Sequence, residues 1–201
     1  MQKSERVELY EKFYFHELDR RDKIASRLST PLGALIGTAG ILAFLLNSSP
    51  QFKDHSVQAI FWLAIASATI TLLIGGWYFR KAWFGHADRH VATAADIDAY
   101  HVQLETQYKD EPGQIEDDFS QFLLDTYRRS ATTNAQNNDK RSIALYRAGC
   151  WLTSAIILAL LSTIPYYFGR TAAHERAKAA CSSSATTTAS GAPCEEQPKS
   201  S

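Results

Sequence analysis

Three uncharged apolar runs constrain this chain more than any other feature of its sequence. They cover residues 28–46, 59–79 and 148–168, which is 19, 21 and 21 residues. An α-helix rises 1.5 Å per residue, so roughly 20 residues cross the ~30 Å hydrocarbon core of a bilayer. Each run therefore predicts a transmembrane helix, although the balanced total of 21 basic and 21 acidic residues would suit a soluble domain.

A soluble bundle of three buried helices is the alternative interpretation. Helices of such a bundle keep a polar stripe where they meet water. The run at 59–79 offers only Ser67, Thr69, Thr71 and the tips of its aromatic rings as polar groups. The pattern thus favours an all-α integral membrane protein with three transmembrane helices.

The distribution of Lys and Arg predicts the orientation of these helices. The leader before residue 28 carries seven basic residues, whereas the loop after the first run carries Lys53 alone. Arg80 and Lys81 follow the second run, and Lys140, Arg141 and Arg147 precede the third. Because basic residues collect on the cytoplasmic side, we expect a multi-pass inner-membrane protein with a cytoplasmic N-terminus and a periplasmic C-terminus.

These features predict seven segments along the chain. They are a cytoplasmic amphipathic helix (1–27), a first transmembrane helix (28–46), an external loop (47–58), a second transmembrane helix (59–79), a cytoplasmic helical hairpin (80–147), a third transmembrane helix (148–168) and an external low-complexity tail (169–201). The tail has too few apolar residues to offset its chain entropy and is expected to be disordered. Cys181 and Cys194 lie in it and could form a disulfide in an oxidising compartment, or remain two unpaired thiols.

The leader contains one apolar face at helical spacing. Val7, Tyr10, Tyr14 and Leu18 recur at steps of three and four, with Phe13 beside them. Such a face could lie on the inner leaflet or pack on the cytoplasmic helices. Acidic residues nearly balance the basic ones, which favours packing against protein.

The cytoplasmic segment is predicted to fold as a helical hairpin. Thr93 and Asp96 have the spacing of a capping box, and the Pro-Gly pair in "DEPGQ" (110–114) predicts a turn. Apolar stripes before and after that turn let the two helices pack together, with the rest of the face open to a partner. The predicted partner-binding face comprises Ile97, Tyr100, Leu104, Phe119, Phe122 and Tyr127.

One long helix is predicted from residue 115 through the third apolar run, because neither Pro nor Gly occurs before Gly149. Along it, Asn134, Asn138 and Arg141 occupy the spacing at which a core would continue. Buried Asn or Arg in helical assemblies fixes register and oligomeric state. The alternative is a solvated linker beside the membrane.

Small residues on the first run predict close helix association. Gly33 and Gly37 form a GxxxG step that Gly40 extends. Packing of this face within one chain or between copies both fit the pattern. We expect a homo-oligomer in the lipid bilayer.

Catalytic chemistry finds little support in the sequence. His86 and His90 would share a helix face near Asp88, as metal ligands can, but no third ligand is apparent, and contact with lipid headgroups is the alternative. The chain lacks a nucleophile elbow, a P-loop and a dinucleotide glycine pattern. The segment 80–147 has 9 basic and 11 acidic residues, which does not suit nucleic acid. We therefore expect no enzymatic activity, cofactor, metal or nucleic-acid partner.

The stretch "YEKFYFHELDRRDKIASRL", followed by a two-span hairpin with a short external loop and then cytoplasmic helices, resembles the SMODS- and SLOG-associating two-transmembrane effector families of bacterial nucleotide-signalling defence systems. The resemblance covers roughly residues 7–130 and concerns topology, and the third span extends beyond the two-span plan. It implies an oligomeric, membrane-disrupting effector triggered by a cytoplasmic protein or a nucleotide signal. The alternative hypothesis is a membrane anchor or scaffold, or an immunity or sensor protein, that binds a partner through its cytoplasmic helices.

Overall fold

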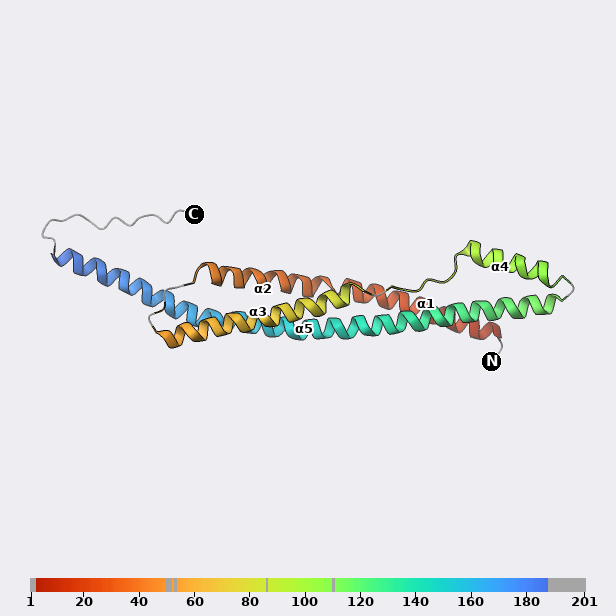
Figure 1. Cartoon of the computed structure of the whole chain (residues 1–201), viewed down its shortest axis with the longest axis horizontal. Helices are drawn as coiled ribbons and strands as arrows, with labels where there is room; N and C mark the ends of the chain where they lie inside the picture. Colours follow the sequence, from red (N-terminus) through yellow and green to blue (C-terminus); the bar gives the residue numbers. More distant parts are fainter. Residues whose placement is uncertain (1–2, 50–51, 53, 86, 110, 188–201) are drawn as a thin grey trace. The chain divides into compact units, whose positions relative to one another are not determined.

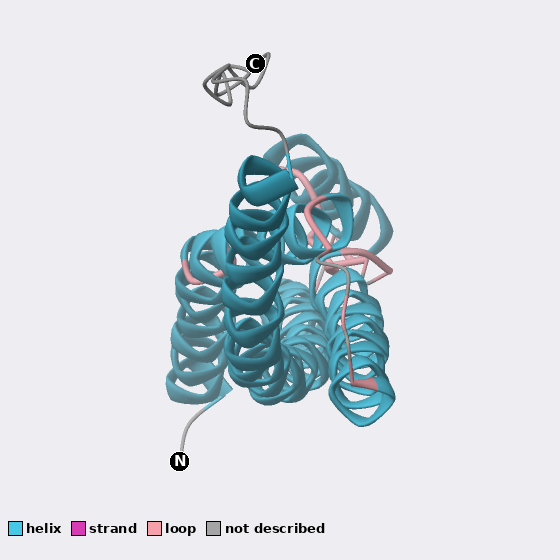
Figure 2. Ribbon diagram, turned by 90° about the vertical axis from the view of Figure 1, so that its left-hand side faces the viewer, coloured by secondary structure: helices cyan, strands magenta, loops and turns pink. Residues whose placement is uncertain are grey.

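The computed structural model describes residues 3–187 apart from 50, 51, 53, 86 and 110, with side chains as far as Thr171. Five helices make up this part of the chain: α1 (Lys3–Ser26), α2 (Ser29–Asn47), α3 (His55–Trp83), α4 (Ala94–Gln107) and α5 (Pro112–Thr187) (Figure 1). Figure 2 shows helices and loops and no strand among the described residues. The predicted all-α class is confirmed.

Within the residues that the structure describes, three helical stretches are long and apolar enough to cross a membrane. They lie in the continuous stretch containing α1 and α2, in α3 and in α5. The three runs predicted from the sequence therefore fall on three helices, as expected of a membrane protein. The orientation of the chain in a bilayer stays a prediction.

The chain divides into two compact units. The first unit comprises Met1–Gly33 and Ile74–Cys150, and the second comprises Ala34–Leu73 and Trp151–Ser201. Helices α2, α3 and α5 each contribute to both units.

The second unit packs segments of α2, α3 and α5 in two buried layers. One layer joins Leu42, Ala68 and Ala159, and the next joins Leu45, Phe61 and Tyr166. Residue numbers rise from the first layer to the second on α2 and α5 but fall on α3, so α3 runs antiparallel to its two neighbours. This alternation is what three successive spans require.

Helix α5 presents its buried side chains at steps of three and four residues or their sums. The buried side chains are those of Leu124, Ser130, Ala131, Asn134, Asn138, Ala144, Ala148, Leu152, Ala155, Ala159, Ser162 and Tyr166, and the adjacent pair Ser130 and Ala131 is the one exception to this spacing among them. We call this row of positions the α5 seam. Such spacing is typical of a helix that keeps one narrow face against its neighbours.

The end of α5 departs from the predicted boundary. α5 does not end with the apolar run at residue 168 but continues to Thr187, so the predicted disordered tail is wrong for 169–187. The stretch "AAHERAKAA" (172–180) explains this, because Ala, Glu, Arg and Lys are strong helix formers. Residues 188–201 lie outside the described residues.

The boundaries of α4 follow the predicted local signals. Thr93 is its N-cap, and the reciprocal bonds with Asp96 complete the predicted capping box, which is confirmed. The break between α4 and α5 falls before residue 112, so the predicted turn lies slightly too late: Pro112 and Gly113 belong to the first turn of α5, and Pro112 is its first residue. Proline suits that position because its missing N–H would have no partner in a first helical turn.

Candidate functional site

An extended segment of the first unit, residues 87–93, connects α3 to α4, and we call it the strap. Gly85 adopts φ +92°, a conformation that glycine tolerates and that ends α3. The predicted helix face shared by His86 and His90 is therefore wrong for His90, which lies on the extended strap, and His86 lies outside the described residues.

Helix α5 holds the strap by its backbone. The Asn134 side chain accepts a hydrogen bond from the Arg89 N–H (2.8 Å) and donates one to the Arg89 carbonyl (3.0 Å). Asn137 donates to the carbonyl of Ala87 at 2.8 Å. Asn134 is 2% exposed, so its amide replaces water as the partner of both Arg89 backbone groups.

A charged cluster lies next to this backbone contact. Arg141 Nη1 is 3.1 Å from Asp88 Oδ1, and both side chains are 12% exposed. Arg21 on α1 approaches the other Asp88 oxygen at 3.6 Å. The pKa of Arg21 is raised chiefly by its hydrogen bond to Asp22, with a smaller contribution from Asp88. The cluster therefore ties α1, the strap and α5 together.

Helix α1 makes a second set of polar contacts with α5. The fully buried Asn138 donates to the Glu17 carbonyl (2.8 Å) and to Glu17 Oε2 (2.9 Å). Arg20 and Asp139 form an ion pair at 2.6 Å, and this contact raises the pKa of Arg20.

Aromatic packing accompanies these bonds and supports the predicted packing of α1 on protein. The ring of Tyr14 lies 5.9 Å from that of Tyr127, whose pKa is raised by burial. Near the start of both helices, Lys3 pairs with Asp117 at 2.9 Å. Contacts advance in the same direction along α1 and α5, so the two helices lie parallel (Figure 1).

The structure thus brings together the three polar residues singled out in the sequence. We call Asn134, Asn138 and Arg141 the polar clamp. Their burial and contacts place them in the core of the first unit, and the solvated-linker alternative does not describe them.

The partners of the polar clamp on α1 were missed by sequence reasoning. From Tyr14, alternating steps of three and four reach Glu17, Arg21, Ile24 and Leu28. Tyr14, Ile24 and Leu28 are buried, and the two charged residues between them are half-buried. The same helical spacing passes through the charged residues Glu17 and Arg21, and this spacing is the sequence signal that identifies them.

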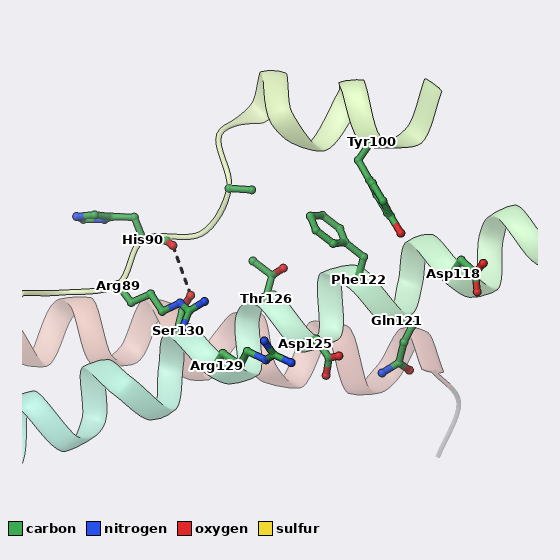
Figure 3. Close-up of a pocket in the computed structure, with 11 residues that line it drawn as sticks. Arg89, His90, Tyr100, Asp118, Gln121, Phe122, Asp125, Thr126, Arg129 and Ser130 are labelled. Atoms are coloured by element: carbon green, nitrogen blue, oxygen red, sulfur yellow. Dashed lines mark hydrogen bonds between the residues drawn. The ribbon is translucent and has the colours of Figure 1, made fainter. Parts of the chain in front are cut away.

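A groove of about 570 Å³ opens beside the strap, between α4 and α5 (Figure 3), and we call it the strap groove. Tyr100 from α4 and Phe122 from α5 lie at one end, with ring centroids 4.3 Å apart. Arg89, Arg129 and Ser130 lie toward the other end, where the Ser130 hydroxyl donates to the His90 carbonyl at 3.5 Å.

The charged groups of the strap groove differ in their pairing. Asp118 accepts a hydrogen bond from Gln114 at 3.1 Å, and Asp125 pairs with Arg128 at 2.8 Å. Within the described part of the chain, neither Arg89 nor Arg129 has an ion pair through its guanidinium. The positive groups of the groove are therefore the ones open to a ligand.

The predicted partner-binding face is used largely inside the chain. Tyr100 packs on Phe122, His101 on Phe119 at 4.9 Å, and Tyr14 on Tyr127. Leu104 is buried and Ile97 is half-buried. These residues hold α1 and α4 on α5, and binding of a partner by this face stays a prediction.

The glycine face of α2 makes no such contacts. Gly33, Gly37 and Gly40 are exposed, and a Cβ added to any of them would meet nothing within 4 Å. α2 packs instead through Thr38, Leu42 and Leu45. The structure therefore does not use the glycines for packing within the described chain.

Neither the predicted disulfide nor a metal site receives support. Cys194 lies outside the described residues, and the side chain of Cys181 is beyond the last described side chain. Across the described ranges, no group of three or more His, Cys, Asp or Glu side chains is placed to hold a metal ion.

The chain matches no protein-family model, no curated protein and no solved structure.

Proposed function

We propose that this chain is a non-enzymatic, oligomeric inner-membrane protein that acts as a signal-gated, membrane-perturbing effector, with its N-terminus in the cytoplasm. The observation that carries the proposal is the position of the polar clamp. It lies on α5, the same continuous helix that supplies the third candidate span.

The contacts of the clamp support a switching role. Each clamp residue bonds a different segment: Asn134 the strap, Asn138 helix α1, and Arg141 the strap carboxylate Asp88. Buried polar pairs of this kind specify one helix register. Removing one partner of such a pair destabilises the fold, because the other partner stays buried without its hydrogen bond. A displacement of α1 or the strap would therefore favour a different register of α5, and a continuous helix carries such a change toward the membrane.

The strap groove is the proposed place for the signal. Arg89 contributes its side chain to the groove while both of its backbone groups are bonded by Asn134. An anionic ligand that draws the Arg89 and Arg129 side chains together would act directly on this backbone contact. A phosphorylated small molecule or an acidic segment of a cytoplasmic protein has the required charge.

The open glycine face supports the oligomeric part of the proposal. In a bilayer, small residues let helix backbones approach closely, and the described chain leaves Gly33, Gly37 and Gly40 uncovered. A second copy of α2 is the occupant that this surface suits.

A scaffold or sensor is the second candidate. It is favoured by α1, where Phe13 is 51% and Phe15 56% exposed although neighbouring Tyr14 is buried. Exposed aromatic side chains are common where proteins bind partners. This role would place a partner protein on α1 and would not require the membrane to leak.

Membrane potential in cells expressing the chain separates the two candidates. With a voltage-sensitive dye, we expect depolarisation by the unaltered chain and its loss in the Asn134→Ala/Asn138→Ala variant and in Gly37→Ile. Gln136→Ala, an exposed neighbour on α5, should depolarise normally. A steady potential in all four strains at equal, verified membrane levels would favour the scaffold and would leave the effector only as a pore that stays closed without its signal.

A further inference from the structure

A second groove, of about 490 Å³, lies in the first unit between the end of α3 and the facing part of α5. Its lining includes three basic residues, Lys81, Lys140 and Arg147, and three apolar or aromatic ones, Tyr78, Phe84 and Ile143. We call it the basic groove. Ala82 and Ala144 pack together in a buried cluster beside it, which brings the two helices close at this level.

The charged residues that line the basic groove are all positive. Its lining contains no acidic residue, whereas the strap groove contains two. Lys81 faces the Trp77 ring at 5.4 Å, and Arg147 faces the Tyr78 ring at 5.7 Å. Among the described side chains, none of the three cations forms an ion pair. The groove therefore concentrates uncompensated positive charge that suits a phosphate group.

Apolar groups are exposed at the same place. Phe84 is 65% exposed and Ile143 54%, and the neighbouring Tyr146 is 74% exposed. A free phosphate ion gains nothing from such surroundings, whereas a lipid carries hydrocarbon next to its phosphate. The pairing of cations with exposed apolar side chains matches an amphipathic ligand.

The position in the sequence points to the membrane surface. Lys81 comes two residues after the uncharged run 59–79, and Arg147 directly precedes the run 148–168. Basic pockets between helices at the cytoplasmic surface are a common way of binding anionic lipid headgroups.

We propose that the basic groove binds the headgroup phosphate of an anionic phospholipid through Lys81, Lys140 and Arg147, with an acyl chain along Phe84 and Ile143. This inference depends on membrane insertion but not on the effector proposal. A scaffold would bind the lipid equally well.

The test measures lipid retention by the purified full-length chain in detergent, using native mass spectrometry. Phosphatidylglycerol and phosphatidylcholine with identical acyl chains are the probes, and inorganic phosphate is the soluble competitor. We expect the unaltered chain to prefer phosphatidylglycerol by about tenfold or more. Lys81→Gln/Lys140→Gln/Arg147→Gln should abolish the preference, and Lys140→Gln alone should reduce it.

A matched variant controls for net charge. Lys12→Gln/Lys23→Gln/Lys109→Gln also removes three positive charges, but at exposed positions outside the groove. This variant should keep the full preference for phosphatidylglycerol. Equal loss in both triple variants would overturn the proposal in favour of general charge attraction. Displacement of phosphatidylglycerol by millimolar inorganic phosphate would assign the groove to a soluble anion instead, and no preference in the unaltered chain would reject the site.

Discussion

The two units differ in what the buried polar side chains of α5 bond to. In the first unit, the α5 seam carries Asn134 and Asn138, with Arg141 following, and each bonds to another segment of the chain. In the second unit, it carries Ala155, Ala159 and Ser162, which are all fully covered. The Ser162 hydroxyl bonds the Leu158 carbonyl of its own helix.

This difference reflects two ways of making helices fit together. In a bilayer, apolar surface gains little by leaving lipid, so close contact between small side chains carries much of the association. Where helices would otherwise face water, burial of apolar surface stabilises many helix arrangements. Buried polar pairs then favour the one arrangement in which their hydrogen bonds form. The polar clamp would then specify register, and the small residues would set the distance between helices.

The largest expected effect comes from breaking the charged contact of the first unit. Arg141→Met leaves the Asp88 carboxylate nearly buried with Arg21 at 3.6 Å as its remaining cation, and should lower the free energy of unfolding by about 3 kcal/mol. Denaturant unfolding in detergent measures it. The double variant Asp88→Asn/Arg141→Met should recover part of the loss, and full additivity of the two changes would show that the pair is not coupled.

Removing the backbone contact should have a smaller effect. Asn134→Ala leaves the Arg89 N–H and carbonyl without their partner and should cost about 2 kcal/mol. Hydrogen exchange of the Arg89 amide should become faster, while Gln136→Ala leaves it unchanged. Unaltered protection of that amide in Asn134→Ala would show that the clamp does not hold the strap.

A larger side chain at a buried alanine of α5 should destabilise the second unit. Ala159 packs against Leu42 and Ala68, so Ala159→Leu should force the helices apart and lower the free energy of unfolding by about 1.5 kcal/mol. Ala66→Leu adds the same volume at an exposed position of α3 and serves as the control. Equal stability of the two variants would argue against close packing at Ala159.

The smallest effect on stability is expected at the glycine face. Gly37→Ile adds a side chain where a Cβ meets open space, so the free energy of unfolding should change by no more than about 0.5 kcal/mol. Self-association in detergent, measured by analytical ultracentrifugation, should nevertheless weaken. Ala39→Ile, on a different face of α2, should leave association intact, and equal association of both variants would move the oligomer interface elsewhere.

Much of the helical framework could be predicted from short-range signals. Absence of charge located the three apolar helices, and Thr93 with Asp96 located the start of α4, because both depend on neighbouring residues alone. The end of α5 does not follow from apolar content, because an alanine-rich sequence favours a helix even where few apolar residues are available for a core.

The site was less accessible to sequence reasoning. Asn134, Asn138 and Arg141 were noticed through their spacing, but their partners lie more than 40 residues away in the chain. A helix across this segment would make Asp88 a companion of two histidines, but Gly85 ends α3 and the chain continues as the extended strap. Contacts between an irregular segment and a helix have no periodicity that a sequence pattern could reveal.

Asn134 and Asn137 recognise peptide groups of the strap, not its side chains. Substitutions at Ala87 or Arg89 can therefore accumulate without loosening the strap, whereas the two asparagines cannot be exchanged so freely. If the strap groove binds the proposed ligand, such an arrangement would separate the evolution of ligand preference from the evolution of the scaffold. Related chains with the same two asparagines would then differ in the ligand that they bind while keeping the same contact between the strap and α5.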